Sequence, residues 1–158
     1  MVESLADKIL RQLDHAAGIY YRLILVVAPA GEGKTVALLD VQDRTDAPLV
    51  NVNLELSRRM LDLTERQRAL ELPRLLRELV SKSEGEMILL DNIEILFDVG
   101  LKQDPLRLLQ GLSRSKTVVA AWNGTINYDS LTYAAAAHPE YRRYPMRDFL
   151  VVSPEVTG

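Results

Sequence analysis

The residues best suited to chemistry are the stretch APAGEGKT, Ala28 to Thr35, which directly follows the apolar run LILVV. An apolar strand, a loop of small residues and a following helix form the setting in which a chain wraps the phosphates of a nucleotide. Backbone N–H groups at the start of a helix attract phosphate oxygens. The sequence therefore predicts a phosphate-binding loop, and the alternative is an ordinary glycine turn that begins a helix.

The residues of this loop have distinct predicted roles. Lys34 should reach the β- and γ-phosphates of a nucleotide, and the Thr35 hydroxyl should bind Mg²⁺. Gly33 should let the backbone approach the phosphate, because a Cβ atom there would intrude. The predicted nucleotide-binding set is Pro29, Ala30, Gly31, Glu32, Gly33, Lys34 and Thr35.

The loop departs from the usual pattern G-x-x-x-x-G-K-[ST] at its first position, which is Ala28. This position falls where the strand ends, so we expect it to require a small side chain more than a positive φ. Alanine should then fit. If a positive φ were required, alanine would cost roughly 1–2 kcal/mol, which nucleotide binding would offset.

A second chemical candidate is the stretch MILLDNIE, which puts Asp91 at the end of an apolar strand. A carboxylate there can hold the water shell of Mg²⁺ opposite Thr35, and the alternative is an acidic cap on the next segment. One helical turn after Asp91 would bring Glu94 to the same side, within reach of an attacking water. The amide of Asn92 can orient water but cannot take its proton.

The elements that must position these residues alternate between strands and helices. Continuous or alternating apolar runs predict strands at 22–28, 48–53, 87–91, 117–122 and 149–153. Helices are expected before Gly18, from Lys34 to about Asp43, over most of 54–86 with a break near Pro73, and after Asp104–Pro105. This alternation predicts an α/β fold with a mostly parallel sheet of about five strands between two helical layers.

Ligands of such sheets bind beyond the carboxyl ends of the strands, where the stretches 28–35, 91–94 and 122–124 all fall. The 158 residues suit a single domain over 1–158, with 47% hydrophobic and 26% charged residues, as in ordinary water-soluble domains. No signal peptide, membrane span or cysteine is evident, so the cytoplasm is the expected location. A net charge of −3 predicts no strong direct binding to nucleic acid. His15 and His138 lack metal-ligand spacing.

The order of loop, Asp-ending strand and VVAAWN strand resembles the AAA-type branch of the P-loop ATPases. That branch also accepts alanine at the first position of the loop. The resemblance implies that Asp91 is the Walker B aspartate. It also implies that Asn123 is the polar residue, called sensor one, that helps to position the attacking water. The alternative for Asn123 is a turn former beside Gly124.

The chain departs from that branch in two places. The family carries a water-activating glutamate directly after the Walker B aspartate, but this chain has Asn92, so Glu94 is the nearest substitute. Only PEVTG follows the fifth strand, so no C-terminal helical lid domain is expected. Arg142 and Arg143 precede the last strand, where the family carries an arginine finger directed at a neighbour's γ-phosphate. The alternative for this pair is a solvated basic loop.

A more extensive resemblance is to the BrxF family, small P-loop proteins of BREX phage-defence systems. It is carried by the segments VNVNLELSRRMLDLTERQR, LLDNIEILF, KQDPLRLLQGLSR, VVAAWNGT and HPEYRRYP. This resemblance implies a bacterial cytoplasmic protein that acts beside larger BREX components.

These observations together predict a P-loop NTPase sandwich that binds ATP and Mg²⁺, hydrolyses ATP slowly and self-assembles head to tail to regulate a defence complex. The alternative is a nucleotide-gated assembly or adaptor module with no meaningful turnover. A small P-loop kinase is less favoured, because it would need a mobile lid with phosphate-binding arginines. No acceptor-binding stretch is evident in the sequence either.

Overall fold

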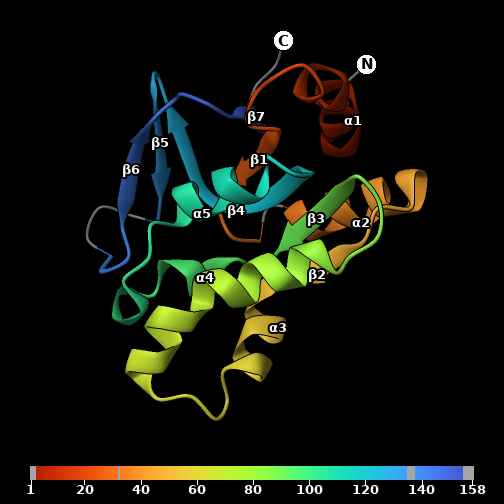
Figure 1. Cartoon of the computed structure of the whole chain (residues 1–158). Helices are drawn as coiled ribbons and strands as arrows, with labels where there is room; N and C mark the ends of the chain where they lie inside the picture. The colour runs from red at the N-terminus through yellow and green to blue at the C-terminus, as the bar shows by residue number, and fades with distance from the viewer. Residues whose placement is uncertain (1–2, 32, 135–137, 155–158) are drawn as a thin grey trace.

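The computed structural model describes residues 3–31, 33–134 and 138–154. These residues form an α/β fold in which a mostly parallel sheet lies between helices on both faces (Figure 1). Within these ranges, none of the helices combines the length and the apolar character that crossing a membrane requires.

The described residues contain five α-helices and two short 3₁₀ helices: α1 (Leu5–Ala16), α2 (Lys34–Thr45), α3 (Val52–Arg59), α4 (Glu65–Ser81), α5 (Pro105–Leu112), η1 (Glu94–Phe97) and η2 (Val99–Leu101). The strands are β1 (Leu23–Ala28), β2 (Leu49–Asn51), β3 (Met87–Asp91), β4 (Thr117–Asn127), β5 (Ser130–Tyr133), β6 (Arg142–Pro145) and β7 (Leu150–Val152).

The five predicted strands all form, in the parallel order β2-β3-β4-β1-β7. The sheet has seven strands rather than about five, because β4 runs past its predicted end and pairs antiparallel with β5, which pairs with β6. The short strands β5 and β6 have no continuous apolar run, which explains why the sequence pattern did not indicate them.

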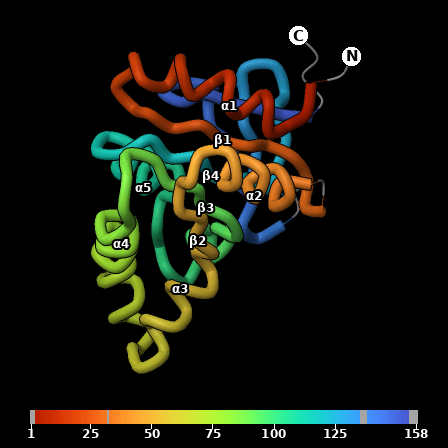
Figure 2. Tube along the Cα trace, turned by 90° about the vertical axis from the view of Figure 1, so that its right-hand side faces the viewer, coloured from red at the N-terminus to blue at the C-terminus, as the bar shows by residue number. Residues whose placement is uncertain are grey.

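Alternate residues of the strands feed two cores. Leu25 and Trp122 face α3, α4 and α5, whereas Ile24 and Val26 face α1 and α2. Figure 2 shows α4 and α5 on one side of the strands and α2 on the other. Trp122 is fully buried in the first of these cores. The parallel pairing of β3, β4 and β1 puts the carboxyl ends of β3 and β1 beside Asn123 of β4 at one edge of the sheet.

The predicted helix break near Pro73 is wrong, because α4 continues through this proline. The chain breaks earlier, between α3 and α4, where Thr64 caps α4 by accepting a hydrogen bond from the Gln67 backbone. A proline within a helix leaves the carbonyl four residues earlier without its N–H donor. Here the Gln103 side chain donates to the Ala69 carbonyl at 2.8 Å and so replaces the missing donor.

Gln103→Ala is therefore expected to destabilise the fold. The change leaves the Ala69 carbonyl without this donor, and the unfolding free energy should fall by about 1–3 kcal/mol. Urea unfolding followed by circular dichroism measures it. Gln110→Ala is the matched control, because the Gln110 side-chain amide makes one long contact of 3.4 Å to the Asp148 carbonyl. Equal stability of the two variants would show that Pro73 needs no such support.

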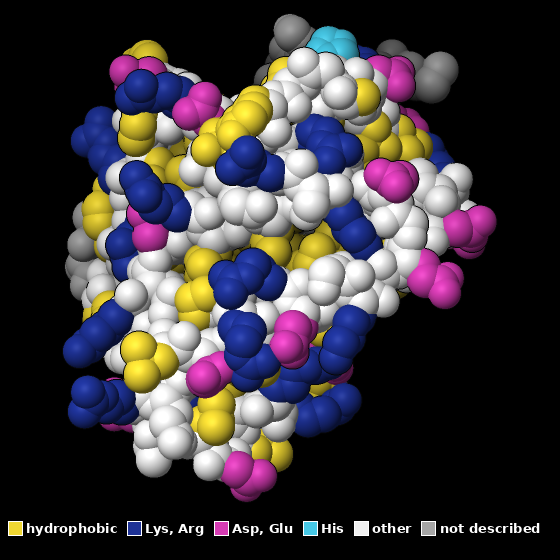
Figure 3. Space-filling view, in the orientation of Figure 1, with side chains coloured by type: hydrophobic (Ala, Val, Ile, Leu, Met, Phe, Trp, Pro, Cys, Tyr) yellow, Lys and Arg dark blue, Asp and Glu magenta, His cyan; other side chains and the backbone are white. Residues whose placement is uncertain are grey.

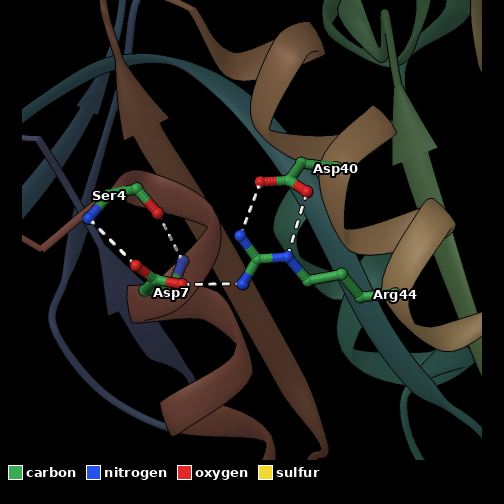
Figure 4. Close-up of polar contacts among 4 residues, drawn as sticks. All are labelled: Ser4, Asp7, Asp40 and Arg44. Carbon is green, nitrogen blue, oxygen red and sulfur yellow. Dashed lines mark hydrogen bonds and ion pairs between the residues drawn. The ribbon is translucent and has the colours of Figure 1, made fainter.

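A surface network joins α1 to α2, the helix that follows the 28–35 loop (Figure 4). Arg44 donates to Asp7 at 2.7 Å and to both carboxylate oxygens of Asp40 at 3.0 Å. Asp7 also completes a capping box with Ser4 at the start of α1. The hydrogen bond from Arg44 holds the pKa of Asp7 below its usual range. The network is exposed, so its role is to orient the two helices rather than to add much stability.

Candidate functional site

The 28–35 loop connects the buried strand β1 to the start of α2. Gly31 and Gly33 have φ angles of 82° and 85°, a left-handed conformation that favours glycine. A Cβ atom added at Gly33 would meet no heavy atom of the chain within 4 Å. The positive φ of Gly33, and not a lack of space, is therefore the reason for glycine at this position. Ala28 is the last residue of β1, pairs with Asn123 and has no positive φ. The expectation that alanine fits this position is confirmed.

Lys34 begins α2 and its side chain turns back into the loop. It is only 6% exposed, and Nζ donates to the Ala28 carbonyl at 2.9 Å and to the Pro29 carbonyl at 2.7 Å. The ammonium group therefore lies beside the loop backbone, among atoms that would surround a phosphate. The predicted loop residues Pro29, Ala30, Gly31, Gly33 and Thr35 are exposed, whereas Glu32 lies outside the described residues.

Thr35 and Asp91 meet although 56 residues separate them. The Thr35 hydroxyl donates to one carboxylate oxygen of Asp91 at 2.6 Å, and the Asn92 backbone donates to the other at 2.9 Å. A hydroxyl and a carboxylate are hard oxygen ligands that suit Mg²⁺. The described residues contain no group of three or more His, Cys, Asp or Glu side chains able to hold a metal. A magnesium ion here would take its other ligands from water and phosphate.

Glu94 reaches the same place through a tight turn after β3. Asn92 has a φ of 50°, and the η1 helix then begins at Glu94. Burial raises the pKa of the half-buried Glu94 carboxyl, and the charge of Asp91 adds to this increase while Lys34 opposes it. The helical turn expected directly after Asp91 is not formed, because Asn92 is left-handed and η1 begins only at Glu94. Glu94 still lines the same cavity as Asp91, and its carboxyl holds its proton more tightly than an exposed one.

Asn53 supports this turn and was missed as a site residue. Its side chain accepts a hydrogen bond from the Ile95 backbone at 2.7 Å, and its backbone donates to the Asn92 carbonyl at 2.8 Å. The sequence VNVN was assigned to a strand ending at 53, but β2 ends at Asn51, which caps α3. The helical position of Asn53 directs its side chain to the turn.

Five predicted polar site residues and Asn92, which follows Asp91, line one cavity of about 370 Å³ at the carboxyl edge of the sheet. They come from three separate segments: Lys34, Thr35, Asp91, Asn92, Glu94 and Asn123. Asn123 lies inside β4, at the point where pairing with β1 gives way to pairing with β5, so the turn alternative for Asn123 and Gly124 is wrong. We call this space the loop cavity.

The two predicted arginines lie outside the loop cavity of their own chain. Both belong to β6, where Arg142 donates to the Gln103 carbonyl at 2.9 Å and Arg143 donates to the Ser130 hydroxyl at 3.1 Å. Arg142 is half-buried and Arg143 is exposed. Of the pair, Arg143 is therefore the residue whose side chain is more accessible to another molecule.

Comparison of the chain with models of known protein families, with curated proteins and with solved structures found no match.

Proposed function

We propose that this chain is a P-loop ATPase that binds Mg-ATP in the loop cavity and hydrolyses it slowly. The observation that carries the proposal is the meeting of the Thr35 hydroxyl and the Asp91 carboxylate at 2.6 Å, beside the buried Lys34. A triphosphate with its magnesium ion needs a cation, backbone donors at a helix start and hard oxygen ligands. The segment from Ala30 to Thr35 supplies the cation, the helix start and the hydroxyl, and the end of β3 supplies the carboxylate.

Slow turnover follows from the residues beside Asp91. Asn92 has no group that can accept a proton from water, so Glu94 is the base in this proposal and Asn123 positions the water. The second candidate is a nucleotide-gated assembly or adaptor module with no meaningful turnover. Asn92 favours this second candidate, because its amide cannot accept a proton from water, whereas a carboxylate at the same position could.

The proposed biological setting rests on the resemblance of several sequence segments to the BrxF family. In this setting the protein acts in the bacterial cytoplasm and regulates larger BREX components. ATP promotes head-to-tail assembly of the chain, which brings an arginine of β6 to the loop cavity of the next subunit. Head-to-tail contacts of this kind build rings or filaments rather than two-fold dimers.

Thermal unfolding tests the nucleotide-binding part of the proposal. Mg-ATP at ~100 times its Kd should stabilise the native state by about 2.7 kcal/mol. Lys34→Ala should remove this increment, because it deletes the cation that contacts the phosphates. The increment must be compared within each variant, since Lys34 also bonds two loop carbonyls and its loss lowers the starting stability. An unchanged melting temperature of the wild type with saturating Mg-ATP would exclude the proposal.

A further inference from the structure

A second cavity of about 790 Å³ opens beside the loop cavity. Both cavities are lined by Ala30, Glu94 and Asn123, so they meet at the residues nearest the expected γ-phosphate. The second cavity is also lined by Gly124, Thr125, Thr132 and Tyr133, which belong to the antiparallel extension formed by β4 and β5. We call it the hairpin cavity. Water is the expected nucleophile in the proposed hydrolysis, but this space is far larger than one water molecule requires.

The hairpin cavity is lined in part by Tyr133, which is only 4% exposed and is backed by the fully buried Phe97 and Trp122. Tyr133 stacks on Phe97 with ring centroids 3.4 Å apart and meets Trp122 edge to face. Gly124 permits the close pairing of β4 and β5 here, because a Cβ atom would collide with the Thr132 carbonyl. The half-buried ring of Tyr141 also lines the cavity. Aromatic walls of this kind bind flat rings and leave polar groups to fix their orientation.

The polar groups of the hairpin cavity favour a ligand that donates hydrogen bonds and carries no negative charge. Two carboxylates, Glu94 and Glu140, line it together with His138, whose Nδ1 accepts a hydrogen bond from the Glu140 backbone. Its lining among the described residues contains no lysine or arginine. Burial, followed by the charges of Glu94 and Glu140, raises the pKa of the Tyr133 phenol, which therefore stays protonated and can donate a hydrogen bond. An anionic ligand would meet uncompensated negative charge.

We propose that the hairpin cavity binds an alcohol that accepts the γ-phosphoryl group of ATP, and that this alcohol is a neutral molecule of nucleoside size with a flat ring. The proposal rests on Mg-ATP binding in the loop cavity. The acceptor oxygen forms a bond to the γ-phosphorus, the bond from that phosphorus to the β–γ bridging oxygen breaks, and the hydroxyl proton passes to Glu94. The products are ADP and the phosphorylated alcohol.

This assignment gives Glu94 a task that matches its position. Glu94 lies on the walls of both cavities, whereas Asn92 lines only the loop cavity of the two. A base on the shared wall is placed to deprotonate a hydroxyl that enters from the hairpin cavity. A single water molecule occupies only a small part of that cavity of about 790 Å³. In this proposal the main reaction is phosphoryl transfer to the alcohol, and slow hydrolysis of ATP by water is a side reaction.

The test uses the full chain with Mg²⁺, γ-labelled ATP and each of the four ribonucleosides at millimolar concentration. We expect label in a nucleoside monophosphate and an ADP production rate about tenfold or more above that with water alone. Nucleoside 5′-monophosphates should accept no label. Thr125→Trp, which narrows the hairpin cavity from an exposed strand position, should lower transfer about tenfold or more. Tyr128→Trp is the control, since Tyr128 lies on the same hairpin and is 97% exposed.

The outcomes separate this proposal from the one on which it rests. If Mg-ATP stabilises the wild type but free phosphate is the only labelled product with every nucleoside, the acceptor assignment is overturned while nucleotide binding stands. Preferred labelling of monophosphates would overturn the neutral-ligand assignment. Absence of Mg-ATP stabilisation would overturn both proposals. The stabilisation by Mg-ATP also reports whether Thr125→Trp is folded, and the wild-type result decides the question if it is not.

Discussion

Replacing Arg142 and Arg143 together by alanine is expected to lower the ATP hydrolysis rate by ~10³–10⁵ while leaving nucleotide binding intact. Phosphoryl transfer spreads negative charge over the equatorial oxygens of the γ-phosphate, and cations stabilise that charge. Lys34 is the one lysine or arginine in the described lining of the loop cavity. In the proposed head-to-tail assembly, an arginine of the neighbouring subunit adds to the charge of Lys34 and Mg²⁺ at the γ-phosphate. Activity should rise faster than linearly with protein concentration.

Subunit mixing measures this effect. The double variant keeps an intact loop and lacks the arginines, whereas Lys34→Ala lacks the loop cation and keeps the arginines. Each should be inactive alone, and the mixture should recover part of the rate. Single variants should differ, with Arg143→Ala causing most of the loss, because the Arg142 guanidinium is bound to the Gln103 carbonyl of its own chain. Rates strictly proportional to concentration, without recovery on mixing, would leave both arginines as surface charges.

Glu94→Gln is expected to lower the rate by about 10²–10⁴ with little change in Mg-ATP affinity, because glutamine cannot accept a proton. Phosphate release at saturating Mg-ATP measures the rate. Glu86→Gln, an exposed change of the same kind, is the control. Asn92→Glu should raise the rate by adding a carboxylate beside Asp91. A wild-type rate in Glu94→Gln would make Glu94 structural and favour the module without turnover.

The pH profile provides an independent check on Glu94. Burial raises its pKa above the ordinary value of 4.5, and a general base works only when deprotonated. The hydrolysis rate should therefore rise with pH through a step that lies above 4.5, and this step should be missing in Glu94→Gln. The pH dependence of the residual hydrolysis by Glu94→Gln is compared with that of the wild type. A rate profile whose step lies at the ordinary carboxyl pKa would show that the half-buried Glu94 is not the base.

Much of the sheet was predictable because β1, β3 and the first half of β4 are short, continuous apolar runs, which are typical of strands covered on both faces. Their order then puts Thr35 and Asp91 at one edge, and their hydrogen bond agrees with that prediction. Local signals also located the start of α5, where Asp104 is the cap and Pro105 the first helical residue.

The remaining features depend on partners that are distant in sequence. Pro73 continues a helix because Gln103 reaches the Ala69 carbonyl, and a local pattern contains no trace of that contact. The dipeptide Asn123–Gly124 has the composition of a turn, yet Gly124 is a strand residue that gives the Thr132 carbonyl room. The hairpin cavity was unforeseen for the same reason, since it forms only when β5 folds back onto β4.

Isothermal titration with Mg-ATP tests the central claim, nucleotide binding by the loop cavity, most directly. The account predicts one nucleotide per chain, an affinity that falls when Mg²⁺ is removed, and no measurable binding by Lys34→Ala. Asp91→Asn should bind ATP and lose most of the magnesium dependence, because the carboxylate beside Thr35 is then neutral. Absence of binding heat at millimolar Mg-ATP, or equal affinity in the wild type and Lys34→Ala, would contradict the account.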